Sequence, residues 1–579
     1  DDSVRSDLFD GLKNNIKLLT SGRLKERIRL NENFETVING HKVRIDEIFE
    51  NDIDLLWHSY TNEMSGWASL AEKFGIKSRT AWAKYQNQLF NDIDESYAIG
   101  KYKGNELLRT NTIKEEKETI KSFFNGIMGR SAEDGDPTSL GNTVLRNLRK
   151  FNFTRVLNQV GVAQLPEFGV ATSQQGWRVL FNEVPLVRRM FGDMDTKGVP
   201  DTFYKDMAII GSSNGDEYLY RLFGSYEVGE RGVAHATNFS KKFRRTEAFA
   251  DNFEKGTGFA SGLFHIDSMQ RKISMRIFVH RLAEDLIKVS EKGTNIGKIS
   301  TSRMRRYKVL GLTDKELQGL AKEFNSSKVV TESNALGTRV LSFKFQEFTD
   351  QALVKKFAIA VNRYTKRAVQ YNMLGDGQRF FSDKALGKTM GQFRQFIMVA
   401  WSKQFLHNVA MADAQTASTF LMTSLIGGSA YYAQTHFNAI GMSDSEKRKF
   451  IRKRLGEKGD YTKLALASFQ RAGWSSLMPP YMDMVTAQLS PENRFNTRSS
   501  GQEMNLITGN PSYDLLFGKA FPLMGNILKS ARNDYSFSQS DMRRFKQMLP
   551  YQNMYGVNQF LNFAIENSGL PKKGSIKNK

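Results

Sequence analysis

Two segments of this sequence have part of the spacing of a ligand-binding loop. The Gly387–Thr389 segment ends like a phosphate-binding loop, but Ser382 occupies the position of its required first glycine. Residues 193–204 imitate a calcium loop, yet Lys197 and Tyr204 stand where oxygen ligands belong. We therefore expect no nucleotide at the first segment, interpret the second as an ordinary polar loop, and expect no bound cofactor.

Histidines and carboxylates also occur at a spacing that could hold a metal ion. His280 and Glu284 lie one helical turn apart, and His265 and Asp267 precede them in the same segment. We interpret these side chains as structural or solvated. The chain has no cysteine, which excludes thiol catalysis and thiolate-bound zinc. No Ser/His/Asp order stands out, so we expect that this chain is not an enzyme, although paired carboxylates carry no sequence signature.

Basic residues dominate the chemistry of the chain. Its 579 residues include 83 Lys and Arg against 61 Asp and Glu, a formal net charge of +22. This excess indicates nucleic acid, an anionic lipid surface or an acidic protein as partner, or it serves solubility alone. Three clusters interleave cations with aromatic residues, which suits phosphate contact without sequence preference. The candidate contact residues are Lys241, Lys242, Arg244, Arg245, Arg303, Arg305, Arg306, Lys447, Arg448, Lys449, Arg452, Lys453 and Arg454.

An uncharged segment directly precedes the last of these clusters. Residues 414–443 contain no Asp, Glu, Lys or Arg. An uncharged segment beside a basic cluster is a common layout for meeting a membrane and its anionic surface. However, only ten of the seventeen residues of Ala417–Ala433 are apolar, which is weak for a solitary membrane-spanning helix.

The pattern within this segment favours close helix packing. On a helical wheel the apolar residues fall on one arc, namely Leu421, Met422, Leu425 and Ile426. The small residues fall opposite, at spacings that let helices approach closely, namely Thr423, Ser424, Gly427 and Gly428. Two interpretations stay open: a helix packed within protein without lipid contact, or a helix inserted as part of an oligomeric wall. The candidate packing or membrane residues are Phe420, Leu421, Ser424, Leu425, Ile426, Gly427, Gly428 and Tyr431.

The elements that carry these residues are expected to be mostly helices. No proline occurs between Pro200 and Pro479, which permits long helices, and the periodicity predicts one helix of about 50 residues over 389–438. Ser443–Glu446 has the pattern of a capping box that begins a short basic helix. Val37–Val43 contains Asn-Gly between apolar residues, which predicts a β-hairpin.

The predicted fold class is mainly α. We expect an extended multi-domain protein with long helices, one small hairpin near the N-terminus and an irregular C-terminal region that contains Pro and Gly. The expected divisions are an N-terminal helical domain with the hairpin (1–140), a central helical domain (141–385), and a C-terminal region with the long helix, the uncharged segment and the basic helix (386–579).

Three stretches resemble a known family of virion proteins. They are Leu145–Leu148 with Val156–Leu165, Met390–Gln404, and Leu549–Asn562. Together they are similar to the C-terminal portion of the large internal virion proteins, the internal core or DNA-ejection proteins, of short-tailed podovirus-type phages. The resemblance covers most of the chain at the level of composition and these three motifs.

This resemblance implies a structural role in transport. Such proteins form a core above the portal in the virion interior, leave through the tail, and reassemble in the host cell envelope as a conduit for the genome. The implied partners are further copies of the chain in a ring or tube, other internal virion proteins and the portal, double-stranded DNA without sequence preference, and the host envelope membrane. The alternative is a soluble, sequence-independent nucleic-acid-binding helical protein or a non-catalytic part of a larger virion enzyme.

Many members of this family carry an N-terminal lytic transglycosylase domain. No motif in this sequence matches the catalytic glutamate motif of that domain. We therefore expect either that the chain is the C-terminal portion of a longer protein or that this member lacks the activity, and no catalytic residue is carried over.

Overall fold

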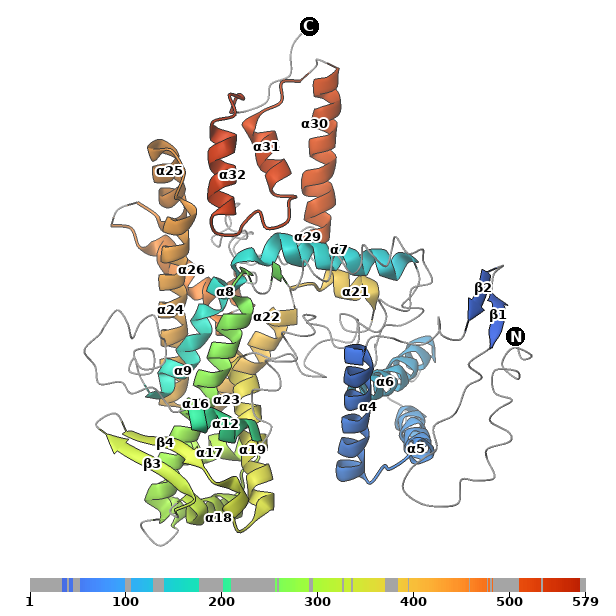
Figure 1. Ribbon diagram of the computed structural model, residues 1–579, viewed down its shortest axis with the longest axis vertical. Helices are drawn as coiled ribbons and strands as arrows, with labels where there is room; N and C mark the ends of the chain where they lie inside the picture. The colour runs from blue at the N-terminus through green and yellow to red at the C-terminus, as the bar shows by residue number, and fades with distance from the viewer. Residues whose placement is uncertain are drawn as a thin grey trace. The chain divides into compact units, whose positions relative to one another are not determined.

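The computed structural model divides the chain into two compact units, which are described separately. Residues 1–109 and 127–130 form the first unit, and residues 110–126 and 131–579 form the second. The structure describes residues 34–38, 41–44, 53–98, 106–128, 140–175, 201–209, 256–257, 260–290, 295–324, 327–334, 337–369, 384–393, 395–457, 459–475, 477–479, 482, 510–532 and 535–572. In these ranges helices predominate, which confirms the predicted mainly α class (Figure 1). The predicted boundary at 140–141 lies shortly after the first unit, and the predicted boundary at 385–386 falls inside the second.

The first unit contains the predicted hairpin and a small group of helices. Strands β1 (Glu35–Ile38) and β2 (His41–Arg44) pair antiparallel, as predicted. The helices are α4 (Ile53–Phe74), α5 (Arg79–Ala98) and the start of α6 (Glu106–Ile127). Gly66 of α4 lies so close to the end of α6 that a Cβ there would be 2.6 Å from the Ile127 carbonyl oxygen. This close approach requires glycine.

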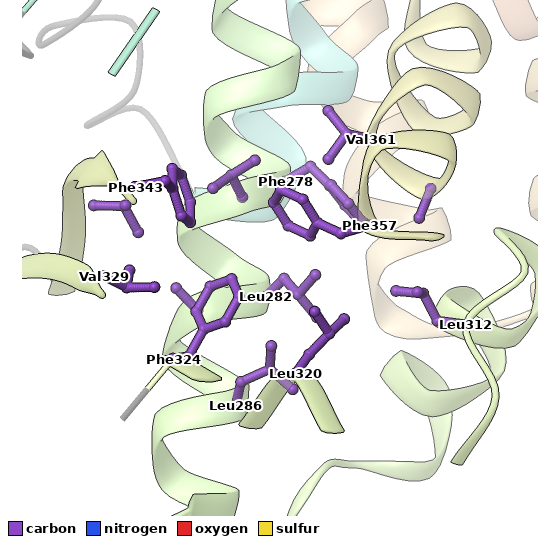
Figure 2. Packing of buried hydrophobic residues seen from close by; sticks show 14 of the residues in the cluster. Phe278, Leu282, Leu286, Leu312, Leu320, Phe324, Val329, Phe343, Phe357 and Val361 are labelled. Carbon is purple, nitrogen blue, oxygen red and sulfur yellow. The ribbon is translucent and has the colours of Figure 1, made fainter. Parts of the chain in front are cut away.

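The main core of the second unit surrounds one long helix. Helix α16 (Leu263–Ser290) places Phe278, Leu282 and Leu286 against a ring of neighbouring elements, and Figure 2 shows these side chains facing Phe324 and Phe357. Leu282 and Leu286 are fully buried. The neighbouring elements are α12 (Asp201–Ile209), α17 (Thr301–Val309), α18 (Asp314–Phe324), β3 (Val329–Asn334), β4 (Gly337–Phe343) and α19 (Gln351–Ala368).

The antiparallel pair β3–β4 is a second hairpin that the sequence analysis did not predict. Its apolar residues include Val329 and Phe343, which face each other across the pair and are both buried in the main core. The sequence does contain a signal for this hairpin. Both strands contain β-branched residues, and Asn334 and Gly337 stand at the ends of the turn.

The predicted helix over 389–438 is wrong, because the chain breaks twice in this range. Helix α21 (Ala385–Met390) ends before Phe393, whose φ is 67°, and a second left-handed residue, Ala412 with φ 48°, separates Met411 from Asp413. Between the breaks lie α22 (Gln395–Ala400), the π-helix η6 (Trp401–Leu406) and α23 (His407–Met411). Helix α24 (Ala414–Asn438) then spans most of the uncharged segment.

Further helices lie before α16 and after α24 along the chain. Before α16 they are α7 (Leu140–Val156), η2 (Leu157–Gln159), α8 (Val160–Gln164), η3 (Leu165–Glu167) and α9 (Phe168–Gln175). After α24 they are α25 (Asp444–Leu455), α26 (Thr462–Arg471), η7 (Gly473–Ser475), α29 (Pro511–Tyr513), the π-helix η8 (Asp514–Ala520), α30 (Phe521–Ala531), α31 (Gln539–Lys546) and α32 (Val557–Glu566). None of the described helices is long and apolar enough to cross a bilayer.

Candidate interface for nucleic acid and anionic surfaces

The start of α24 is fixed by one carboxylate. The Asp413 side chain accepts a hydrogen bond from the Thr416 amide at 2.8 Å, which caps the helix N-terminus. The Arg306 guanidinium of α17 donates to both Asp413 oxygens, at 2.6 and 2.8 Å, and the Ser302 hydroxyl also donates to Asp413. Burial alone raises the pKa of Asp413, but these hydrogen bonds hold the pKa well below its usual value.

The predicted contact residues on α17 therefore have partners within the chain. Arg306 is paired with Asp413, Arg303 is paired with Asp285 at 2.5 Å, and Arg305 donates to the Met411 carbonyl at 3.3 Å. Lys241, Lys242, Arg244 and Arg245 lie outside the described residues.

The small residues of α24 pack against helices of the same chain. Gly427 and Gly428 face α26, where a Cβ on Gly428 would be 3.1 Å from the Ser468 Cβ. On another side, Gly169 of α9 lies so close to α24 that a Cβ would be 2.4 Å from the Thr423 amide nitrogen. The predicted small-residue contacts are thus made by α26 and α9.

Adding one methyl group at Gly169 is expected to lower the free energy of unfolding of the second unit by about 1–3 kcal/mol, because the α24 backbone cannot yield as a flexible side chain would. Chemical denaturation of Gly169→Ala measures this loss. The matched control is Gly525→Ala in α30, where no atom lies within 4 Å of the added Cβ and a small stabilisation is expected. Equal stabilities of the two variants would contradict the close packing of α9 on α24.

Aromatic and cationic side chains complete the inner contacts of α24. Phe420 stacks on Trp474 with ring centroids 4.4 Å apart, and the Trp474 indole donates to the Phe420 carbonyl at 3.2 Å. Tyr431 is buried beneath the Arg471 guanidinium, 4.9 Å from its ring centroid. Ile426 packs on the small cluster of Phe168, Ile273 and Ile277, and Ser424 is partly buried.

The inner side of α24 carries polar side chains beside these aromatic and apolar contacts. The buried side chains of α24 include Thr416, Thr419, Thr423, Gln434 and Thr435. The outer side carries Leu421, Leu425 and Tyr432, which are 57%, 47% and 50% exposed. We call these three residues the α24 outer stripe. A helix of a soluble protein normally turns its large apolar side chains toward the core, so an exposed apolar stripe marks an interaction surface.

Helix α25 begins where the sequence predicts, but the predicted capping box is wrong. The Ser443 side chain makes no capping hydrogen bond, and the Glu446 carboxylate instead lies 3.7 Å from Arg543 and 3.9 Å from Lys572. A hydrogen bond with Glu566 lowers the pKa of Glu446, whereas burial and this same bond raise the pKa of Glu566. This contact connects α25 to α32.

The predicted cations of α25 point to solvent. Lys447, Arg448, Lys449, Arg452 and Lys453 are exposed, and no residue of the helix is buried. Their intramolecular contacts are weak, such as that between Arg452 and Glu457 at 3.6 Å, where both side chains are 71% exposed. Arg454 lies over the Phe450 ring at 4.6 Å. The helix therefore presents a concentrated positive surface that is available to phosphate groups.

The C-terminal helices also turn large apolar side chains outward, which the sequence analysis missed. Among their buried residues are polar ones, including Lys546, whose ammonium group donates to the Asn558 and Asn562 side chains, both at 2.5 Å. Burial, with a smaller contribution from the positive charge of Arg543, lowers the pKa of Lys546 to about 8. The exposed apolar residues, which we call the C-terminal outer face, are Leu516, Phe517, Phe521, Met524, Ile527, Leu528, Phe560 and Phe563. The helical spacing of Phe517, Phe521, Met524 and Leu528 was the available signal.

The candidate metal ligands contact other side chains of the fold and do not form a metal site. The His280 ring packs on Phe203 with centroids 5.7 Å apart, Asp267 pairs with Arg271 at 2.8 Å, and Glu284 pairs with Lys288 at 2.8 Å. No group of three His, Asp or Glu that could hold a metal ion occurs within the described part of the chain.

Comparison with protein-family models, with curated proteins and with solved structures found no match for this chain.

Proposed function

We propose that the chain is a structural component of a phage internal core that is ejected into the host envelope and helps to form a conduit for the genome. The observation that carries this proposal is the exposure of large apolar side chains on three helices, α24, α30 and α32. This arrangement is suited to a chain whose outer faces are covered in an assembly.

The position of the charged helix supports the same function. Helix α25 is the next helix after α24 and contacts both α24 and α26. Exposed cations without a base-reading motif contact a phosphate backbone weakly and without sequence preference, which permits a transported duplex to move. They equally suit the anionic surface of a membrane next to an apolar face.

Self-association is the first expected property of such a protein. We expect the wild-type chain to form oligomers, and Phe521→Ser with Leu528→Ser to weaken association on the order of 100-fold, because each side chain contributes about 1.5–3 kcal/mol when fully buried. Mass photometry over a concentration series measures the change.

The control substitutes exposed leucines elsewhere. Leu107→Ser and Leu140→Ser remove side chains that are 77% and 51% exposed, and are expected to leave association unchanged. A wild-type chain that stays monomeric at micromolar concentration and ignores anionic liposomes, while still binding DNA, would favour the soluble nucleic-acid-binding alternative.

A further inference from the structure

A cavity of about 440 Å³ lies in the second unit, where several helices converge. Its walls come from α9, α16, α17, α19, the η6–α23 segment and the start of α24. This volume is within the range of ligand pockets and is far too small for a double helix. The α25 surface described above contributes no residue to it.

The cavity is strongly basic. Its lining includes the cationic side chains of Arg281, Arg303, Arg306, Arg367 and Lys403, against a single lining carboxylate, Asp413. This excess of positive charge favours an anionic ligand.

Three of these arginines already have carboxylate partners. Arg306 binds Asp413, Arg303 binds Asp285, and Arg281 lies 3.7 Å from Glu284. Each guanidinium carries five N–H donors in a planar fork, so a pairing that uses one or two of them leaves others for a ligand.

Arg367 differs from these three. Its Nη1 donates to His407 Nε2 at 3.3 Å, and no carboxylate in the described part of the chain lies within ion-pairing distance of its guanidinium. A partly buried guanidinium without a counter-ion is costly, and an anion in the cavity would offset that cost.

The titration of the neighbouring groups agrees with an excess of positive charge. Burial lowers the pKa of His407 most, and the positive charges of Arg367 and Arg306 lower it further, to about 4. The negative charge of Asp413 opposes this shift. Burial also lowers the pKa of Arg367, and the positive charges of Arg306 and Arg363 lower it further. His407 is therefore neutral at pH 7 and accepts the hydrogen bond from Arg367.

Polar and aromatic groups of other elements complete the walls. Gln404 and Asn408 contribute amides and Ser418 contributes a hydroxyl, all groups that bind phosphate oxygens and sugars. The Tyr364 ring stacks on Phe278 at 4.7 Å and forms an aromatic wall. Guanidinium forks, a lysine and an aromatic wall together suit a nucleotide better than a simple carboxylate.

We propose that this cavity binds the phosphate group of a nucleotide, with Arg367 and Lys403 as the principal phosphate contacts. The proposal does not depend on the conduit function, because the cavity is separate from the α25 surface and from both outer apolar faces. The phosphate comes either from a free nucleotide or from the end of a nucleic-acid strand, and the two sources share the same chemistry.

Calorimetric titration and thermal shift of the full chain test this proposal with four probes. They are pyrophosphate, ADP, a 5′-phosphorylated dinucleotide, and the same dinucleotide without its terminal 5′-phosphate. Wild-type protein is expected to bind the phosphorylated probes and not the last one. Tighter binding of ADP than of the dinucleotide identifies a free nucleotide as the ligand, and the reverse order identifies a strand end. Failure of all three phosphorylated probes to bind at millimolar concentration overturns the proposal.

The variants are Arg367→Gln and Lys403→Gln, each expected to weaken phosphate binding on the order of 10- to 100-fold. Arg367→Gln is expected to keep or raise the melting temperature of the empty protein, since it removes a guanidinium without a counter-ion. The matched control is Lys355→Gln, an exposed lysine of α19 outside the cavity, with unchanged binding expected. Unchanged phosphate affinity in both cavity variants would contradict the assignment of the cavity as the phosphate site.

Discussion

Asp413→Ala is expected to lower the free energy of unfolding of the second unit by about 3–4 kcal/mol. The substitution removes the N-cap of α24, which contributes about 1 kcal/mol, and leaves the Arg306 guanidinium without its bidentate partner. Both side chains are mostly enclosed, with 12% and 15% of their surfaces exposed. Removing one member of such a pair costs more than the pair itself contributes, because the remaining charge stays desolvated.

Chemical denaturation measures this loss, and a double variant identifies its origin. Asp413→Ala with Arg306→Met removes both charges, so we expect it to regain much of the stability lost by Asp413→Ala alone. The control is Asp444→Ala at the first position of α25, an exposed carboxylate whose loss is expected to cost less than about 1 kcal/mol. A loss in Asp413→Ala no larger than in Asp444→Ala would show that the Arg306 pair contributes little.

The same carboxylate predicts the direction of an acid effect. The pKa of Asp413 is lower in the folded chain than in the unfolded chain, so the unfolded chain binds the proton first as the pH falls. The stability from Asp413 is fully present above its unfolded pKa, near 3.9, and is lost progressively as the pH falls through lower values. The difference in stability between wild type and Asp413→Ala should therefore shrink below about pH 4.

The two breaks in the predicted long helix show where sequence periodicity reaches its limit. Phe393 and Ala412 adopt left-handed backbone conformations although neither is glycine. At the first break Gly391 ends α21, whereas the second break contains no glycine or proline. For the second break, Asp413 was a signal in the sequence, because an aspartate directly before a helix is a common N-cap. The apolar periodicity continued across the break, because both flanking helices bury residues in the same unit, and so it concealed the cap.

The uncharged segment was predictable as a helix but not in its orientation. The structure exposes Leu421 and Leu425 and buries Gly427 and Gly428, as the predicted division requires. However, Ile426, which belongs to the same predicted apolar arc as the two leucines, packs inward on the small apolar cluster. Which arc faces inward depends on α9 and α26, whose Gly169 and Ser468 fit against α24 without space for larger side chains. These long-range partners leave no periodic signal in the segment itself, so the sequence could not show that the small residues pack within the chain.

The prediction that bears most directly on function concerns the cations of α25. Replacing Lys447, Arg448, Lys449, Arg452, Lys453 and Arg454 together with glutamine is expected to reduce affinity for duplex DNA at moderate salt on the order of 100-fold or more. Binding to anionic liposomes should fall in parallel, because each cation near the surface contributes about 1 kcal/mol. The fold should survive, since no residue of α25 is buried and glutamine retains helix propensity.

Fluorescence anisotropy across a salt series, together with liposome flotation, separates this contribution from that of net charge. The control replaces six exposed lysines elsewhere and so removes the same formal charge: Lys73, Lys77, Lys84, Lys315, Lys322 and Lys355. If α25 is the contact surface, its variant should lower the slope of log affinity against log salt by several units, whereas the control should shift affinity only slightly. Equal losses in the two variants would mean that DNA senses the diffuse charge of the whole chain, and the assignment of α25 as the interface would then be wrong.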